Sequence, residues 1–255
     1  MTGGARGIGR GIAERLVAQG FAVVVTDVDG RAAQECAAQI GAAEGRAVDV
    51  RDPQAHRDAA GAAVRHGALT AWFNNAGVGD DGTVVELSDE TVRRLVEVNL
   101  LGTLWGMRAA LAAFGPRGGD VVNTASLSGL GPVPGYSVYA ASKAAIVSVS
   151  MSAAAEAPRG VRVHALCPDG VRTAMLDAQA PGGLGSALVH SGGRILTVEE
   201  TAAAAVALLG SRRVVRTLPA WRGALLRATT LAPSVAAKGT EVFAAQGRKA
   251  IARER

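Results

Sequence analysis

Two side chains four residues apart, Tyr139 and Lys143, form the pattern in this sequence that is best suited to acid–base chemistry. On a helix, this spacing places both side chains on one face, about one turn apart. An ammonium group beside a phenol favours the phenolate, so we expect the pKa of Tyr139 to be lowered from its ordinary value of about 10. Such a phenol can exchange a proton with an alcohol or a developing alkoxide. The hydroxyl of Ser126, thirteen residues before the tyrosine, is placed to hold the same substrate oxygen.

A half-buried tyrosine beside a surface lysine gives the same spacing, because short motifs also match by chance. The elements that would position the pair separate the two interpretations. A glycine-rich loop, Thr2-Gly3-x-x-x-Gly7-x-Gly9, leads directly into a helix predicted over residues 8–19. Glycines allow a tight turn, and the N–H groups at the positive end of a helix bind a pyrophosphate.

The apolar run over residues 21–27 predicts a buried strand that ends at Asp27. An acidic residue about 20 positions after a glycine loop is suited to binding the ribose hydroxyls of a dinucleotide. Loop, helix, strand and acid in this order indicate a dinucleotide site more strongly than the glycines alone.

Strands and helices continue to alternate along the chain. We predict further strands over 45–50, 69–74, 120–125, 161–167 and 214–218, and helices over 31–40, 53–66, 88–114, 136–157 and 197–209. This alternation predicts one α/β domain over residues 1–255, a doubly wound Rossmann-type parallel sheet with helices on both faces. Ligands bind at the carboxyl ends of such strands. The candidate ligand-binding residues lie at or just past the ends of predicted strands: Gly7, Asp27, Asp49, Asn75, Ser126 and Pro168.

The N-terminus departs from the pattern, because only Met1 precedes the glycine loop. In a dinucleotide-binding sheet the first strand precedes that loop and is central. We therefore expect the first strand to be missing from this chain. Either the start is misplaced and upstream residues are missing, or the strand has been lost, and we favour the first explanation.

Composition excludes several other functions. The net charge of +5 comes mainly from scattered arginines, and aromatic residues make up only 4% of the chain, so a nucleic-acid-binding surface is not expected. The two cysteines, Cys36 and Cys167, and the four histidines form no metal-ligand spacing. No signal peptide opens the chain and no apolar run reaches spanning length, so we expect a soluble cytoplasmic protein without a membrane span.

Taken together, these motifs resemble the classical short-chain dehydrogenase/reductase family over residues 2–209. The resemblance implies a catalytic tetrad of Asn99, Ser126, Tyr139 and Lys143. It also implies a cofactor site to which Tyr139 and Lys143 contribute together with Gly3, Arg6, Gly7, Ile8, Gly9, Asp27, Asp49, Val50, Asn75, Ala76, Gly77, Pro168, Val171 and Thr173.

In the implied mechanism, Tyr139 is the acid/base, Lys143 lowers the pKa of Tyr139 and holds the nicotinamide ribose, and Ser126 positions the substrate oxygen. Asn99 would hold a water that links the lysine to solvent. NAD is favoured over NADP, because the Asp27 carboxylate would repel a 2′-phosphate. Arg6 is the counter-argument, since an arginine in the loop can bind that phosphate.

The sequence thus predicts an NAD(P)-dependent oxidoreductase whose small-molecule substrate is a hydrophobic secondary alcohol or ketone. A reductase of 3-oxoacyl thioesters and a non-catalytic sensor or scaffold that binds NAD(P) stay open as alternatives. The resemblance implies a homodimer or homotetramer. Two segments depart from the family: Pro168-Asp169 replaces a Pro-Gly pair, and residues 212–255 are atypical. Residues 169–194 are rich in Gly and Ala and are predicted to form a mobile loop or short helical lid over the substrate.

Overall fold

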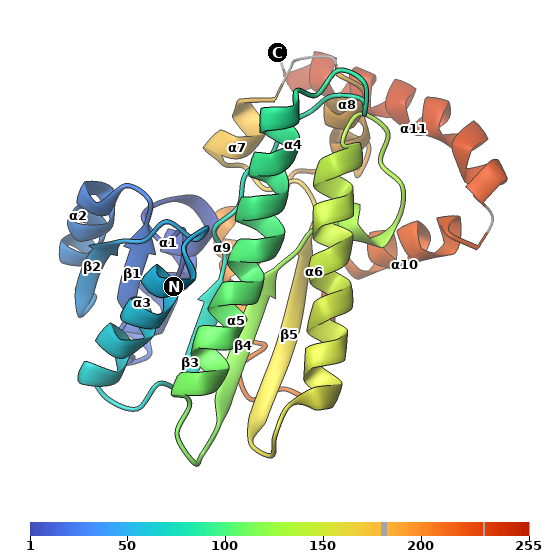
Figure 1. The fold of residues 1–255 in the computed structure, drawn as a ribbon. Coiled ribbons are helices and arrows are strands. Elements are labelled where there is room, and N and C mark those ends of the chain that lie inside the picture. The colour runs from blue at the N-terminus through green and yellow to red at the C-terminus, as the bar shows by residue number, and fades with distance from the viewer. Residues whose placement is uncertain (180–182, 232, 255) are drawn as a thin grey trace.

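The computed structural model describes residues 1–179, 183–231 and 233–254 of the chain, and its described strands all pair in parallel, with helices on both sides (Figure 1). The strands are β1 (Val24–Asp27), β2 (Glu44–Ala47), β3 (Ala71–Asn74), β4 (Gly119–Thr124), β5 (Val161–Pro168) and β6 (Val215–Leu218). The helices are α1 (Gly7–Ala18), α2 (Gly30–Ile40), α3 (Pro53–Arg65), α4 (Asp89–Leu95), α5 (Gly102–Ala113), α6 (Ser137–Glu156), α7 (Ala174–Asp177), α8 (Leu184–His190), α9 (Val198–Val206), α10 (Ala220–Thr229) and α11 (Pro233–Glu254). The predicted parallel α/β architecture is confirmed.

Alternation of side chains along the strands builds a separate core on each face of the sheet. Phe73 and Val122 pack with the apolar sides of α1 and α9. Their neighbours Trp72 and Val121 point the other way and pack with α3 and α5. Because both faces are covered, the strands are buried, and the edge that remains available to a ligand is formed by their carboxyl ends.

The predicted long helix over residues 88–114 is interrupted. Ser88 caps α4 as expected, but residues Val96–Leu101 form a π-helical segment before α5 begins. Such a wide turn alters the direction of the side chains on it and is frequent at functional sites. Here it carries Asn99, which is fully buried.

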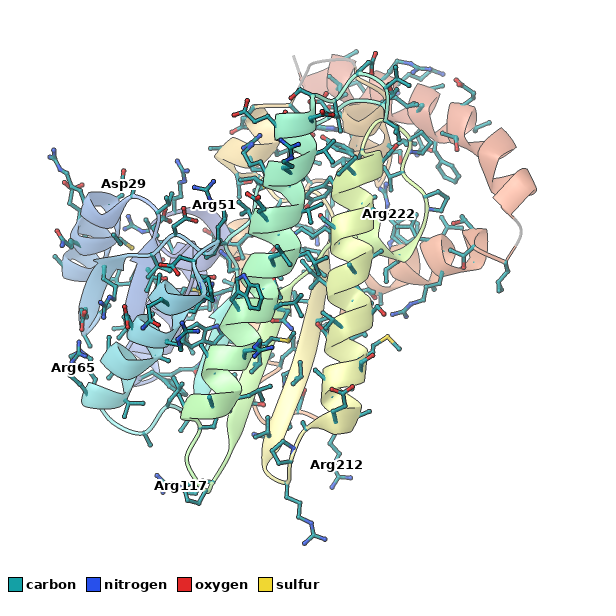
Figure 2. The ribbon with its side chains drawn as sticks, viewed as in Figure 1. Asp29, Arg51, Arg65, Arg117, Arg212 and Arg222 are labelled. Atoms are coloured by element: carbon teal, nitrogen blue, oxygen red, sulfur yellow. The ribbon has the colours of Figure 1, made fainter. Side chains whose placement is uncertain are left out.

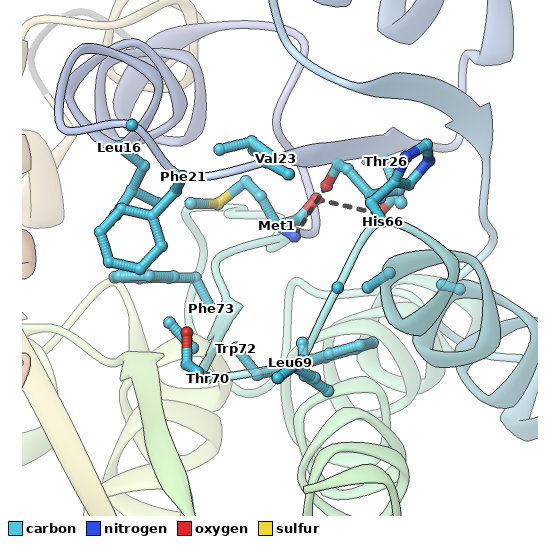
Figure 3. Close-up of a pocket in the computed structure, with 18 residues that line it drawn as sticks. Met1, Leu16, Phe21, Val23, Thr26, His66, Leu69, Thr70, Trp72 and Phe73 are labelled. Atoms are coloured by element: carbon cyan, nitrogen blue, oxygen red, sulfur yellow. Dashed lines mark hydrogen bonds between the residues drawn. The ribbon is translucent and has the colours of Figure 1, made fainter. Parts of the chain in front are cut away.

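No complete strand lies between β1 and β3 among the described residues; the strands belong to two sheets, β1-β2 and β3-β4-β5-β6. Residues 1–4 occupy only part of the space between β1 and β3, near the carboxyl ends of these strands. Thr2 pairs with Thr26 of β1, and its N–H donates to the Phe73 carbonyl of β3, 3.0 Å away. Below them a cavity of about 310 Å³ lies between the two strands, lined by residues that include Phe21, Val23 and Leu69 (Figure 3).

Helix α6 corrects one expectation, because it is long and apolar enough to cross a membrane by length and composition, with a mean hydropathy of 1.3. A core helix of a globular protein passes the same test. Its buried side is polar in part, with Lys143 and Ser150, and packs against β5. We therefore interpret α6 as a core helix of the sheet.

An ionic cluster at the opposite end of the sheet from the carboxyl ends joins β4 to β5. The buried Asp120 carboxylate accepts hydrogen bonds from Arg162 at 2.7 Å, from His164 at 3.0 Å and from the Gly210 N–H at 3.1 Å. Burial opposes its ionisation, but the hydrogen bonds from His164, Arg162 and Gly210 outweigh burial and lower the pKa of Asp120 to about 2.

We expect the Asp120→Asn variant to be less stable than the unmodified chain by about 2 kcal/mol at pH 7, or about 6 °C in Tm. A carboxyl whose pKa is lower in the folded state than its ordinary 3.8 stabilises the fold above that pH, and this contribution is lost as pH falls toward 2. Thermal unfolding from pH 7 to pH 2.5 measures the difference. The exposed Glu156→Gln is the control; a Tm difference for Asp120→Asn that stays constant with pH would contradict the expectation.

Candidate active site

Helix α6 brings Tyr139 and Lys143 together on one face, as their spacing predicts. The Lys143 Nζ lies 5.6 Å from the centre of the Tyr139 ring. The same ammonium donates to the Thr124 carbonyl at the end of β4, 2.9 Å away, and only 4% of the lysine is exposed. Ser126 follows that strand end, and its hydrogen bond with Tyr139 places the serine hydroxyl beside the phenol. Three of the four expected catalytic side chains therefore converge at the carboxyl end of β4.

The electrostatics of the pair differ from the sequence-based expectation. Burial raises the pKa of Tyr139, and the hydrogen bond with Ser126 opposes that rise only in part. Burial also lowers the pKa of Lys143, to about 8. The expected lowering of the Tyr139 pKa is thus wrong, because the loss of solvent on burial outweighs the hydrogen bond with Ser126. The lysine still carries its proton at pH 7.

Asn99 reaches the same place from the π-helical segment. Its amide Nδ2 donates to the Val78 carbonyl and to the Ser142 hydroxyl, both at 3.0 Å, and its Oδ1 accepts from the Val78 N–H at 2.9 Å. Gly77 lies between the side chains of Asn99 and Lys143: a Cβ on it would lie 3.3 Å from the Asn99 Oδ1 and 3.4 Å from the Lys143 Nζ. Asn99 and Lys143 therefore face each other across a glycine.

The glycine loop has the shape needed to hold a diphosphate. Gly3 and Gly7 have φ values of 58° and 54°, which side chains disfavour, and a Cβ on Gly9 would lie 2.0 Å from the Gly3 carbonyl. No side chain caps the N-terminus of α1 at Arg6, so the N–H groups of the first turn, around Ile8, remain available to an anion. This cradle fits the pyrophosphate of a dinucleotide.

Asn75 joins the glycine loop to the catalytic end of the sheet. Its Nδ2 donates to the Gly3 carbonyl at 3.0 Å, and its Oδ1 accepts from the Thr124 hydroxyl at 3.3 Å. The Thr2 hydroxyl accepts from the N–H groups of Asn75 and Ala76 at 3.1 and 3.2 Å. The glycine loop and Lys143 are therefore linked through Asn75, which follows β3, and Thr124, which ends β4.

The expected adenosine side of the site is also assembled. The Asp27 carboxylate ends β1 and accepts from the Ala5 N–H of the glycine loop at 3.3 Å. Asp49 follows β2, where Arg51 forms an ion pair with it at 2.6 Å and lowers its pKa. Val50 is buried and packs beneath Gly102. Arg6 is exposed on the loop.

Pro168, Val171 and Thr173 follow β5 toward the glycine loop. Val171 is buried and pairs with Leu196, and the Thr173 hydroxyl donates to the Val171 carbonyl at 3.2 Å. A Cβ on Gly7 would lie 3.4 Å from the Thr173 methyl, so this threonine borders the diphosphate cradle. The predicted cofactor residues that come at and after the end of β5 therefore lie next to the glycine loop.

Three contributing side chains, those of Ser142, Asn74 and Asn123, are not among the predicted site residues. The Ser142 hydroxyl, between Asn99 and the Tyr139 carbonyl at 2.7 Å, was missed, although its position three residues after the tyrosine places it on the same helix side. The buried Asn74 and Asn123 side chains bond each other at 2.8 Å and fix the two strands that carry the site. Their pairing depends on the strand register, which no local pattern reports.

Comparison with known proteins agrees with this arrangement. A family model described as short chain dehydrogenase matches residues 1–182. The chain therefore belongs to the short chain dehydrogenase family. It is 40% identical over 174 residues to the sorbitol dehydrogenase of Cereibacter sphaeroides, a match that covers 66% of this chain and 68% of that one. It is 37% identical over 224 residues to the 2,5-dichloro-2,5-cyclohexadiene-1,4-diol dehydrogenase of Sphingobium indicum, covering 82% and 88% of the two chains.

A solved structure gives the same result for the fold. The 3-ketoacyl-(acyl-carrier-protein) reductase of Brucella melitensis, complexed with NADH, superimposes with a TM-score of 0.76 at 29% identity. The match covers 84% of this chain and 92% of that one. The protein is thus an NAD(P)-dependent oxidoreductase of the alcohol/ketone type with a Rossmann-type fold, and its cofactor is a nicotinamide dinucleotide.

Proposed function

We propose that Tyr139 exchanges the proton of the substrate hydroxyl while the bound nicotinamide supplies or accepts the hydride at the same carbon. The observation that carries the proposal is the convergence of Tyr139, Lys143 and Ser126 at the end of β4, next to the glycine cradle. Ser126 shares the substrate oxygen with the phenol and orients it. Lys143 favours the phenolate when an alcohol is oxidised and donates toward the ribose of the cofactor.

Asn99 completes a route for the proton. Its amide lies across Gly77 from the lysine and is fixed by both polar groups of Val78. A water held between Asn99 and Lys143 would connect the lysine to solvent, so that each turnover can return or remove one proton. This assignment gives all four tetrad residues separate roles.

The substrate that fits best is an apolar secondary alcohol or its ketone. Met175 of the lid lies beside the catalytic ring: a Cβ on Gly79 would be 3.6 Å from the Met175 sulfur and 3.9 Å from the Tyr139 Cε2. The methionine is 42% exposed and offers an adaptable apolar wall. Relatives that are named as dehydrogenases of sorbitol and of a chlorinated cyclic diol support an alcohol as substrate class. The second candidate, a 3-oxoacyl thioester, is supported by the reductase from Brucella melitensis.

NAD is the cofactor that we propose, on the basis of Asp27. Its carboxylate stands at the end of β1 beside the glycine loop, where it would bond ribose hydroxyls and repel a 2′-phosphate. We also propose a homodimer or homotetramer, since the outer sides of the α4–α5 and α6 helices expose Val96, Leu111 and Met151. The two free buried cysteines are consistent with a reducing, cytoplasmic location.

A panel of alcohols and ketones, assayed by the absorbance of NADH or NADPH, tests the proposed substrate class and the proposed cofactor. We expect apolar secondary alcohols to give the highest kcat/KM and NAD to be preferred over NADP by at least about ten-fold, because the like charges lie close together. In Asp27→Ser the preference should shrink or reverse. A preference for NADPH in the unmodified protein would contradict the role of Asp27, and turnover limited to acyl thioesters would favour the second candidate.

A further inference from the structure

The described residues 172–179 and 183–195, here called the lid, lie between β5 and α9. The two ends of the lid are held together at its base, where the Arg172 N–H donates to the Leu196 carbonyl at 2.9 Å and the Leu196 N–H donates to Gly170 at 2.8 Å. Within the lid, α7 carries Met175 beside the catalytic tyrosine, and α8 follows it. What holds α8 in place therefore also shapes the substrate side of the site.

A buried ion pair fastens α8 from outside the lid. Arg222, in the first turn of α10, pairs with Asp169 at 3.2 Å, and both side chains are nearly inaccessible, at 12% and 9% exposure. The same guanidinium donates to the Leu188 carbonyl at 2.5 Å and to the Ser191 hydroxyl at 3.1 Å. A Cβ on Gly192 would lie 1.9 Å from Arg222 Nη1, so the lid backbone is packed directly on the pair.

Asp169 follows Pro168 at the end of β5, and its N–H donates to the Leu218 carbonyl of β6 at 2.8 Å. Burial raises the pKa of Asp169, whereas Arg222 opposes that rise. The backbone of Asp169 is therefore fixed to the sheet, and its carboxylate is linked to the lid through Arg222. Arg222 is the only side chain in the described residues that contacts both Asp169 and α8 through ion pairing and hydrogen bonds.

The other side of α8 rests on the catalytic segment. A Cβ on Gly185 would lie 2.3 Å from the Tyr136 ring, and the rings of Tyr136 and Tyr139 have centres 5.8 Å apart. A shift of α8 would therefore be transmitted through Tyr136 to the acid/base residue. Helix α11 covers α8 as well, because a Cβ on Gly247 would meet the Ala187 carbonyl at 1.7 Å.

We propose that Arg222 is a positioning residue for substrate binding: through Asp169, Leu188 and Ser191 it locks the lid against the end of β5 and so sets the distance between α8 and the Tyr136–Tyr139 rings. The C-terminal segment beyond β6 thereby becomes part of the substrate site, although it touches no reacting atom. This inference rests on the proposed function for its kinetic part and on the geometry alone for its structural part.

The test compares Arg222→Met, Arg222→Lys and Asp169→Asn with Arg212→Met, which removes the same charge from an exposed position at the other end of the sheet (Figure 2). In Arg222→Met we expect KM for the alcohol to rise about ten-fold, with kcat changed less and the Kd for NADH within two-fold of the unmodified value. Arg222→Lys should recover part of the loss, since it keeps the charge but not the fork of donors. Arg212→Met should behave like the unmodified protein.

Trypsin provides a readout that does not depend on activity. The lid contains two exposed arginines, Arg172 and Arg194, and cleavage there should be at least about ten-fold faster in Arg222→Met when NADH binding is intact. Unchanged cleavage or unchanged KM in a folded Arg222→Met protein would overturn the proposal, as would an equal effect of Arg212→Met. Faster cleavage in a protein that oxidises no alcohol at all would support the anchoring of the lid and count against the proposed function instead.

Discussion

Tyr139→Phe should lower kcat by about 10²- to 10⁴-fold, the usual contribution of a positioned acid or base, with little change in NADH affinity. The substitution removes only the oxygen that exchanges the proton. The phenyl ring still packs beside Lys143 and Tyr136, so α6 and the lysine that faces the cofactor keep their positions. Turnover from NADH absorbance and the Kd from NADH fluorescence measure the two effects separately.

Tyr136→Phe is the matched control, three residues earlier on the same segment. The Tyr136 hydroxyl is buried and has no hydrogen-bond partner among the described residues, and burial raises its pKa. Removing it leaves no partner unsatisfied, so activity and stability should stay near those of the unmodified protein. If Tyr136→Phe lost turnover and Tyr139→Phe kept it, the acid/base assignment would have to move to Tyr136.

Lys143 explains why the phenol can work although burial raises its pKa in the protein chain. The lysine is only 4% exposed, and among the described residues its one hydrogen-bond acceptor is the Thr124 carbonyl at 2.9 Å, so its positive charge is poorly screened. Since its pKa of about 8 lies above neutral pH, the charge is present under working conditions. In the proposed mechanism this charge favours the phenolate, and the proton that Tyr139 takes from an alcohol passes on toward Asn99.

The parts of the site that the sequence predicts are those that depend on motifs of neighbouring residues. A glycine loop before an amphipathic helix, an acid after an apolar run, and a tyrosine and a lysine one helical turn apart each depend on a few neighbouring residues. The fold follows for the same reason, because alternating periodicities of two and 3.6 residues require a covered parallel sheet. Tyr139, Lys143, Ser126 and Asn99 could therefore be named from the sequence, and the structure brings the first three together at the end of β4, while their catalytic roles stay a prediction.

What escaped prediction depends on residues far apart in the chain. The π-helical turn at Asn99 breaks a segment whose sequence is uniformly helical, and it follows from the packing of that segment against Val78 and Ser142. The pKa of Tyr139 was expected to fall, but burial by other elements decides its direction. The Asp169–Arg222 pair joins positions more than fifty residues apart, and neither residue stands in a motif.

The interval between β1 and β3 leads to the second large expected effect. At its upper end the Met1 amino group lies where a strand amide would lie, and it donates to the Val24 carbonyl at 3.1 Å. Burial lowers the pKa of this amino group to about 5, so at pH 7 it is held as a neutral amine. Below it, the cavity of about 310 Å³ separates two parallel strand edges whose backbone groups can pair with a strand that runs in the same direction (Figure 3).

Joining an apolar extended segment of about five residues to Met1 should therefore raise Tm by about 10 °C. Burying three or four of its side chains between the two cores contributes about 1.5–3 kcal/mol each, and new backbone hydrogen bonds to both strand edges contribute about 0.5–1.5 kcal/mol each. Together these gains exceed the cost of ordering the backbone, about 1–2 kcal/mol per residue. The added amides would also join the sheets of β1 and β3 into one.

An extension of equal length with two prolines is the control, because proline cannot donate to the neighbouring strands although it adds the same number of residues. Thermal unfolding should separate the two proteins by most of the expected shift, and hydrogen exchange should show new protection at Val24 and Phe73, which border the cavity. Equal melting temperatures for the unextended, apolar and proline-containing chains would mean that the interval is already closed by its own side chains. The sheet would then be stable in two parts, and the glycine cradle would be tied to the end of β3 by the contacts of Thr2 and Gly3 with Asn75 and Ala76.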